Sequence, residues 1–295
     1  MQESRLTTIL NGFGVSLGDG IIGLQALAAA RETGALTGRV VLARTEPPSK
    51  PLVPQLYRLA DEFAEILPMA EAPLAGRVID IRDFAFDPHF ARVSMIDFFL
   101  TRLEIEPETI PAALKRNRWL RSCAGALPPL GLPPDYILLC PAASIALRDM
   151  PEPVQAAIAS RLAARGCAPV VTQGAALPGT VQAPAVTTIQ ALCALVAGSS
   201  AVISTDTAMV HLADAFDRPC LALFTTHRPE WRVRDYPLCT PLYLRVPALP
   251  ESLEFPRNEA DLQAARAAWF PDGPDLAWVA RVVDQFLEGI AAPGA

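Results

Sequence analysis

The strongest constraint on the fold is an alternation of short apolar runs with helix-like segments, which occurs twice along the 295 residues. In the first half, the expected strands are 7–12, 39–45 and 77–84, and the expected helices are 21–34, 54–67 and 92–105. Strands that are apolar on both faces and separated by helices of about 10–15 residues indicate a parallel sheet covered on both sides. The first half therefore predicts a βαβ domain.

The same alternation begins again after ALPPLGLPPD (126–135), which has four prolines in ten residues and is predicted to be a linker. In the second half, the expected strands are 136–140, 169–173, 200–205 and 219–224, and the expected helices are 151–166, 188–199, 207–216 and 275–290. A second βαβ domain of similar size is therefore expected after the linker.

We thus expect an α/β protein with two Rossmann-like βαβ domains, at 1–130 and 131–274. The last segment, 275–295, contains a helix with a long apolar stripe and is expected to pack back on the first domain. Ligands of such sheets bind outside the carboxyl ends of the strands, so the two domains are expected to face each other across a cleft.

Composition excludes several classes of protein. With 31 acidic and 25 basic side chains, the net charge of −6 argues against a broad nucleic-acid surface. No apolar stretch approaches the roughly 20 residues of a membrane-spanning helix, and MQESRLTTILNGFG lacks the features of an export signal. The six cysteines include no C-x-x-C pair, so buried thiols are expected and a metal site is not. We predict a cytoplasmic protein with at most peripheral membrane contact.

A glycine-rich turn, GFGVSLGDGIIGL (12–24), joins the first expected strand to the first helix. Gly12, Gly14 and Gly18 are spaced almost as in a dinucleotide-binding fingerprint, in which glycines let a pyrophosphate approach the backbone. The negative charge of Asp19 would compete with such a phosphate. Asp19 is therefore either the N-cap of the helix or a carboxylate that acts on a neutral group such as a sugar hydroxyl.

The turn STDTAMVHLADA (204–215) follows an expected strand of the second half. Asp206 and Thr207 lie at the strand–helix junction, where free N–H groups and the helix dipole suit a diphosphate. His211 lies one helical turn further on and can hydrogen-bond a phosphate or sugar hydroxyl, adding positive charge when protonated. The alternative is structural, with Asp206 as an N-cap and His211 as a half-buried helix residue.

A further turn, CPAASIALRDMPEP (140–153), follows the first strand of the second half. Ser144 can offer a hydroxyl and a backbone N–H to phosphate oxygens, and Arg148 can neutralise a leaving diphosphate. Alternatively, Arg148 is a loop arginine paired with Asp149 or solvent.

Together the three turns resemble glycosyltransferase family 9, the heptosyltransferase-like enzymes of bacterial lipopolysaccharide biosynthesis. The family turn G-D-x-[IV]-x-x-x-x-A-L corresponds here to LGDGIIGLQAL (17–27). The family block D-T-[GA]-x-x-H-[LA]-A-x-A, with proline and an apolar strand after it, corresponds to DTAMVHLADAFDRPCLALF (206–224). The resemblance implies a glycosyltransferase B fold and inverting sugar transfer that needs neither a metal nor a cofactor.

The resemblance also implies a role for each matched residue. Asp19 matches the general base for the acceptor hydroxyl, with Gly18 and Gly20 beside the acceptor. The implied donor-binding residues are Ser144, Arg148, Asp206, Thr207, Ala208, His211, Thr225 and Thr226. The implied donor is a nucleoside-diphosphate sugar, with ADP-heptose the first choice. The implied acceptor is a saccharide or glycolipid, and the implied location is the cytoplasm, at the inner face of the bacterial inner membrane.

The sequence departs from the family pattern in several places. Arg148 stands where the family usually has lysine, and DMP (149–151) follows instead of a basic residue, tryptophan and proline. Residues 225–227 read TTH where the family has G-P-T. No counterpart of the acidic residue that often binds the donor ribose is visible around Gln173 and Gly174. These departures bear on the donor base and sugar more than on the type of reaction.

Two other functions fit parts of the sequence. An NADP-dependent oxidoreductase would use the Gly12, Gly14 and Gly18 turn, with Arg44 as the partner of the 2′-phosphate, but it leaves the DTAMVH block without a role. A catalytically inactive relative would bind a nucleotide sugar without transferring it, and it would tolerate Asp19→Asn.

Overall fold

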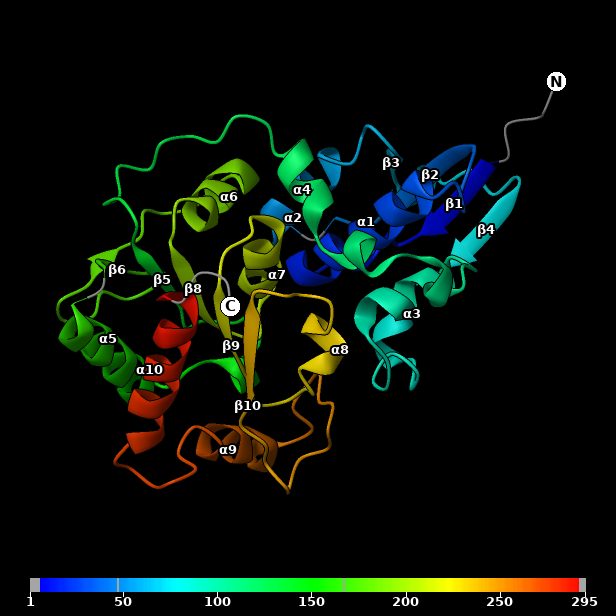
Figure 1. Cartoon of the computed structure of the whole chain (residues 1–295). Helices are drawn as coiled ribbons and strands as arrows, with labels where there is room; N and C mark the ends of the chain where they lie inside the picture. Colours follow the sequence, from blue (N-terminus) through cyan, green and yellow to red (C-terminus); the bar gives the residue numbers. More distant parts are fainter. Residues whose placement is uncertain (1–5, 47, 167, 292–295) are drawn as a thin grey trace. The chain divides into compact units, whose positions relative to one another are not determined.

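The computed structural model describes residues 6–46, 48–166 and 168–291. The chain divides into two compact units, each with its own parallel sheet (Figure 1). Unit 1 comprises Met1–Leu127 and Val186–Cys193, and unit 2 comprises Pro128–Ala185 and Ala194–Ala295. The expected α/β class with two parallel-sheet domains is confirmed.

Unit 1 is built on a four-stranded sheet with the strand order β3-β2-β1-β4. Its strands are β1 (Leu6–Leu10), β2 (Arg39–Arg44), β3 (Glu65–Pro68) and β4 (Arg77–Asp80). All neighbouring strands run parallel, so their carboxyl ends lie at one edge of the sheet. The strand order reverses between β1 and β4, which is the position where open α/β sheets bind ligands. The glycine-rich turn after β1 lies at this reversal.

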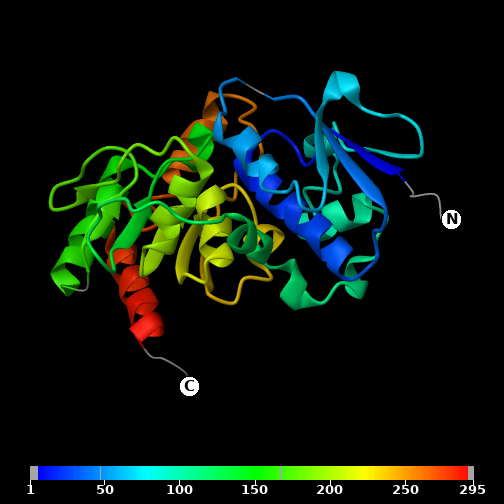
Figure 2. The same ribbon diagram turned by 90° about the horizontal axis from the view of Figure 1, so that it is seen from above.

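The central helix of unit 1 is α1 (Leu17–Glu32), which packs against the three other α-helices of the unit (Figure 2). These helices are α2 (Leu52–Arg58), α3 (Met95–Arg102) and α4 (Arg118–Cys123). Short 3₁₀ turns are η1 (Met69–Glu71), η2 (Phe84–Phe86), η3 (Pro107–Thr109) and η4 (Ala112–Lys115). Thus α1 both follows the glycine-rich turn and anchors it to the core.

The expected helix at 54–67 is wrong in its second half. Helix α2 ends at Arg58, and turns follow in which the N–H groups of Phe63 and Ala64 both donate to Ala60 O. Residues 65–68 are then extended and pair with β2 as strand β3. Pairing with a neighbouring strand therefore overrides the helical spacing of the apolar residues in this stretch.

Unit 2 contains a six-stranded parallel sheet with the strand order β10-β9-β8-β5-β6-β7. Its strands are β5 (Ile137–Cys140), β6 (Val170–Thr172), β7 (Val181–Gln182), β8 (Ala201–Thr205), β9 (Cys220–Phe224) and β10 (Cys239–Tyr243). The strand order reverses between β5 and β8. The strands β7 and β10 are the two edges, which the sequence analysis missed, and the proline at position 241 is compatible with an edge strand.

The helices of unit 2 are α5 (Glu152–Arg165), α7 (Ala208–Ala215), α8 (Glu230–Val233), α9 (Glu259–Ala267) and α10 (Ala277–Ala291), with a 3₁₀ turn, η5 (Ala146–Arg148). The helix α6 (Ile189–Ala197) begins in the segment assigned to unit 1.

The last helix completes the core of unit 2. Trp278, Val283 and Phe286 of α10 are buried in one cluster with Leu139 and Ile203 of the sheet. The helix lies beside α5 (Figures 1 and 2). The expected packing on the first domain is therefore replaced by packing on the sheet of unit 2, whose apolar face needs the cover.

Five cysteines are described as free thiols. Cys140, Cys193 and Cys220 are buried and Cys123 and Cys239 are half-buried, whereas the cysteine at position 167 lies outside the described residues. Burial raises the pKa of Cys193 to about 12, so this thiol stays protonated at neutral pH. Within the described ranges, no helix is long and apolar enough to cross a membrane.

Gly23 of α1 provides a test of how the turn is anchored. A Cβ atom at Gly23 would lie 2.0 Å from Cγ of Phe13, a fully buried side chain in the glycine-rich turn. We expect Gly23→Ala to lower the free energy of unfolding by about 1–3 kcal/mol, because the Phe13 ring must move within a packed core. Urea denaturation of the two proteins measures this difference.

Gly289 of α10 is the matched control, because, apart from its chain neighbours and the nearby backbone of its own helix, no atom of the described residues lies within 4 Å of its Cβ position. Gly289→Ala should be neutral or raise the free energy of unfolding by up to about 1 kcal/mol, since alanine is the better helix former. Similar effects of the two substitutions would contradict the packing described for Phe13.

Candidate functional site

The first polar turn is held in place by the start of α1. Ser16 is the N-cap of this helix, and its Oγ accepts a hydrogen bond from the backbone N–H of Asp19 at 3.1 Å. The N-cap alternative for Asp19 is therefore wrong. Asp19 is half-buried in the first turn of the helix, where a negative charge is favourable, and its Oδ2 lies 3.4 Å from the Cβ position of Gly14. The carboxylate thus lies at the reversal of the unit 1 sheet.

Two buried side chains fix the backbone beneath Asp19. The guanidinium carbon of Arg44 lies 3.2 Å from the centre of the Tyr57 ring, and Arg44 Nη1 donates to Gly14 O at 3.0 Å. The Tyr57 hydroxyl accepts from Phe13 N at 3.0 Å. Gly12 has φ of +55°, and a Cβ there would lie 2.9 Å from Arg44 Nη1. The close approach of buried side chains therefore explains why glycine is needed at position 12, and no bound pyrophosphate is required to explain it.

The same geometry bears on the oxidoreductase alternative. Arg44 is only 2% exposed, and it is held between the Tyr57 ring and the backbone of the turn. A 2′-phosphate of NADP would need an accessible guanidinium at the end of β2. The position of Arg44 does not fit that role.

An aromatic cluster supports the turn from the other strand at the reversal. Phe84 of η2 follows β4, and its Cε1 lies 2.8 Å from the Cβ position of Gly14. Phe84 packs against Phe90, Phe98 and Phe99 with ring centres 5.1–6.5 Å apart. Gly14 is therefore the residue that lets the turn approach this cluster.

In unit 2, the loops after β5 and β8 meet at the reversal of the sheet. Arg148 Nη1 lies 3.2 Å from Asp206 Oδ2, and Thr205 Oγ1 donates to the backbone oxygen of Arg148. Thr207 is the N-cap of α7, because its Oγ1 accepts from Met209 N at 3.3 Å. Asp206 thus precedes the N-cap and pairs with Arg148. The alternatives that Asp206 is the N-cap and that Arg148 pairs with Asp149 or solvent are therefore wrong.

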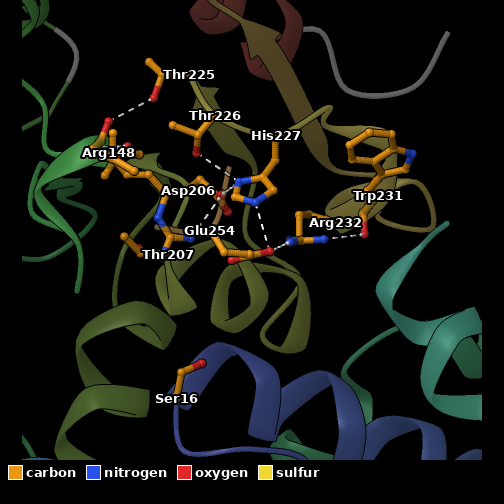
Figure 3. Close-up of polar contacts among 12 residues, drawn as sticks. Ser16, Arg148, Asp206, Thr207, Thr225, Thr226, His227, Trp231, Arg232 and Glu254 are labelled. Atoms are coloured by element: carbon orange, nitrogen blue, oxygen red, sulfur yellow. Dashed lines mark hydrogen bonds and ion pairs between the residues drawn. The ribbon is translucent and has the colours of Figure 1, made fainter. Parts of the chain in front are cut away.

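Asp206 also belongs to a larger charged network (Figure 3). His227 Nδ1 lies 3.4 Å from Asp206 Oδ2 and 2.9 Å from Thr226 Oγ1. On the other side of the ring, His227 Nε2 donates to Glu254 Oε1 at 3.0 Å, and Arg232 Nη2 donates to the same oxygen at 2.7 Å. We call Arg148, Asp206, His227, Arg232 and Glu254 the Asp206 network.

Neighbouring charges keep both carboxylates of this network ionised. Burial opposes ionisation of Asp206, but the charge of Arg148 and the hydrogen bond and charge of His227 outweigh it and hold the pKa well below its usual range. Burial likewise opposes ionisation of Glu254, yet His227 and Arg232 lower its pKa to about 2. At neutral pH the network therefore contains two carboxylates and two guanidinium groups, with the imidazole between the carboxylates.

His211 is buried within α7 and lies close to a tyrosine. Its Nδ1 lies 2.9 Å from the Tyr236 hydroxyl. Burial lowers the pKa of His211 to about 4, although the charge of Asp206 opposes this shift. The ring is therefore neutral at pH 7, and the expectation that a protonated His211 adds charge is wrong at that pH. A neutral ring can still hydrogen-bond a ligand.

The other predicted residues lie in different surroundings. Ser144 is exposed in the loop after β5, and Ala208 begins α7. Thr225 and Thr226 are buried, and their hydroxyls lie within hydrogen-bond distance of Leu147 O and His227 Nδ1. Gly18 is half-buried, whereas the Cβ position of Gly20 lies 2.9 Å from Leu56 Cδ2, so Gly20 serves packing with α2.

Sequence reasoning missed three members of the Asp206 network. His227 was noted only as a departure from the family pattern, and Arg232 was not singled out. Glu254 lies in a loop that carries no motif. The signal available in the sequence was the histidine itself, because a polar ring directly after an apolar strand such as β9 needs buried partners.

Comparison with known proteins gives one family match and several similar folds. Residues 111–237 match the model of glycosyltransferase family 9 (heptosyltransferase). The fold is similar to E. coli heptosyltransferase WaaC with ADP (14% identity, 97% of this chain and 99% of that chain, TM-score 0.56). It is also similar to E. coli ADP-heptose lps heptosyltransferase II (14% identity, 98% and 100%, TM-score 0.59). No match was found among the curated proteins.

A third similar structure is the iron-containing dodecameric glycosyltransferase TibC from enterotoxigenic E. coli (14% identity, 99% of this chain and 79% of that chain, TM-score 0.64). In the part of the chain that the structure describes, no group of three or more His, Cys, Asp or Glu residues could hold a metal ion. Whether the reaction needs a metal stays a matter of prediction.

These similarities define a chain with the glycosyltransferase B fold. Residues 111–237 are similar to glycosyltransferase family 9, the heptosyltransferases, which confirms the resemblance inferred from the sequence; the matched range contains the block at 206–224 and not the turn at 17–27.

His211 provides a test by pH. Its folded-state pKa of about 4 lies below the ordinary value of 6.5, so between these values the unfolded state binds more protons than the folded state. Stability should therefore fall as the pH is lowered from 6.5 towards 4. We expect His211→Asn to remove roughly 2 kcal/mol of the stability lost between pH 7 and pH 4.5. Chemical denaturation at the two pH values measures this.

His89, an exposed histidine of unit 1, is the matched control. His89→Asn should leave the loss of stability between the two pH values unchanged. An unchanged loss in His211→Asn as well would contradict a buried, neutral His211.

Proposed function

We propose that the protein is an inverting glycosyltransferase that needs no metal. It transfers heptose or a similar sugar from a nucleoside-diphosphate donor to a hydroxyl of a saccharide or glycolipid acceptor. The observation that carries this proposal is the position of the polar turns. In each unit they lie where the strand order reverses, after β1 in unit 1 and after β5 and β8 in unit 2.

Unit 2 has the groups that a diphosphate requires. At the N-terminus of α7, Thr207 caps one backbone N–H group, and the other N–H groups of the first turn can bind a phosphate. Arg148 pairs with Asp206, the residue just before this cap. The negative charge of Asp206 would repel phosphate, but Arg148 and the rest of the network compensate it. Preorganised donors of this kind stabilise the charge that develops on a leaving nucleoside diphosphate. The neutral ring of His211 is suited to bind a sugar or phosphate oxygen without net charge.

Two of the similar structures support adenine as the base of the donor nucleotide. WaaC was solved with ADP, and TibC was solved with ADP-D-beta-D-heptose. We therefore propose ADP-heptose as the first candidate donor, with Ser144, Ala208, Thr225 and Thr226 near the diphosphate.

Unit 1 supplies the base. A sugar hydroxyl is a weak nucleophile, so a carboxylate within about 3 Å must accept its proton as it attacks. Asp19 fits this role because its side chain is not used as the helix cap and its backbone is held by Ser16. Gly18, which is half-buried next to Asp19, is the residue proposed to lie beside the acceptor.

The test of the base is Asp19→Asn. We expect transfer to fall by about 10²–10⁴-fold, the usual contribution of a general base, while binding of the nucleoside diphosphate stays unchanged. Asp61→Asn, which changes an exposed carboxylate of unit 1, is the control and should transfer normally. Full transfer activity in Asp19→Asn would rule out Asp19 as the base.

The donor is identified by thermal stabilisation of the wild-type protein. A ligand that binds only the folded state raises the melting temperature, so ADP-, GDP- and UDP-sugars can be compared with NADPH. We expect the ADP-sugar to stabilise most and Arg148→Ala to weaken the effect. Stabilisation by NADPH alone would favour the oxidoreductase, and stabilisation by a nucleotide sugar without any transfer would favour the inactive relative.

A further inference from the structure

Glu254 has one carboxylate oxygen that is occupied and one that is not. Its Oε1 accepts from both His227 and Arg232, whereas Oε2 has no hydrogen bond or ion pair with any residue in the described ranges. The Glu254 side chain is 22% exposed, while Asp206 at the other end of the imidazole is 3% exposed. Glu254 is therefore the more exposed of the two carboxylates in the Asp206 network, and Figure 3 shows both beside the His227 ring.

The loop that carries Glu254 is held firmly against the phosphate-side loops. Leu253 N donates to Thr226 O at 3.0 Å, and Ser252 forms an antiparallel bridge with His227. The side chain of Leu253 packs with Leu147, the residue before Arg148, in a small separate core. The position of Glu254 is therefore coupled to the loop after β5, which carries Arg148, and to the loop after β9, which carries His227.

A purely structural role explains only part of this arrangement. Arg232 is buried and needs a negative partner, which Glu254 provides. Burying such a pair brings little stability compared with apolar side chains of similar volume. An ionised carboxylate is also unfavourable beside a site for diphosphate. The partly exposed Glu254 side chain thus keeps one acceptor-only oxygen, Oε2, that could accept hydrogen bonds from the hydroxyl groups of a ligand.

The topology indicates which hydroxyls these are. In mononucleotide-binding α/β units, the carboxylate that binds the ribose comes from the end of the strand that follows the first one. That strand here is β6, on one side of the reversal. Glu254 lies on the other side, because its two partners, His227 and Arg232, both follow β9. The sugar beyond the diphosphate would lie on that side.

We propose that Glu254 Oε2 accepts hydrogen bonds from hydroxyl groups of the transferred sugar and that Glu254 is a specificity residue for the glycosyl part of the donor. This inference rests on the proposed function, since it takes the loops after β5 and β8 as the diphosphate site. His227 and Arg232 act as positioning residues that hold Oε1 and leave Oε2 for the ligand.

The test compares Glu254→Gln with the wild-type protein in binding of ADP and of the ADP-sugar that stabilises the wild type most. Glutamine keeps the shape and can still accept from Arg232 through its carbonyl oxygen, but it replaces the second acceptor with a donor. We expect affinity for ADP to stay within about twofold, and the additional affinity that the sugar provides to fall by roughly 10- to 100-fold. Isothermal titration calorimetry gives both values.

Glu251→Gln is the matched control, because Glu251 lies on the same loop and pairs with Arg228. It should change neither affinity. If Glu254→Gln does not fold, Glu254→Asp takes its place, because it keeps the charge on a shorter side chain. It should also reduce the additional affinity that the sugar provides.

An equal loss of affinity for ADP and the ADP-sugar in Glu254→Gln would overturn the inference and leave Glu254 with a structural role. No change in either affinity would overturn it as well. A wild-type protein that binds ADP but gains no affinity from any sugar would also overturn it, while leaving the donor site in place. A wild-type protein that binds no nucleotide at all would instead contradict the proposed function.

Discussion

The ion pair between Asp206 and Arg148 organises the loops at the carboxyl edge of the unit 2 sheet. Without its positive neighbours, a carboxylate at 3% exposure would be neutral or would not be tolerated in the core. With them, Asp206 fixes the guanidinium of Arg148 and, through His227, the loop of Glu254. One buried charge thereby aligns three loops that are distant in the sequence. The proposed diphosphate site thus contains a carboxylate of the protein, whose charge Arg148 compensates.

The glycine-rich turn shows how one pattern can have two physical causes. Its spacing is close to that of a nucleotide-binding turn, yet Gly12 and Gly14 are needed because Arg44, Tyr57 and Phe84 approach the backbone closely. The side chains that require these glycines come from β2, α2 and η2. A sequence pattern in the turn alone cannot separate close approach by a ligand from close approach by a distant part of the same chain.

Sequence reasoning found those parts of the fold and site that depend on local order. The strand, cap and helix around Asp206 were predicted because an apolar run, a capping residue and helical spacing are contiguous there. The caps were assigned to the wrong residues, because Ser16 and Asp19, like Asp206 and Thr207, are all good caps and differ only in backbone position. Glu254 and Arg232 could not be found, since pairing with His227 depends on how loops far apart in the sequence meet.

The helix α10 closes the core of unit 2 from the far end of its sequence. During synthesis, strands β5, β8 and β9 leave the ribosome well before the side chains of Trp278 and Phe286 that cover their apolar face. Until then, that face is available to other apolar surfaces, which is the condition under which nascent chains aggregate or bind chaperones. The completion of unit 2 thus waits for the synthesis of α10, whereas most of unit 1 is already synthesised by that time.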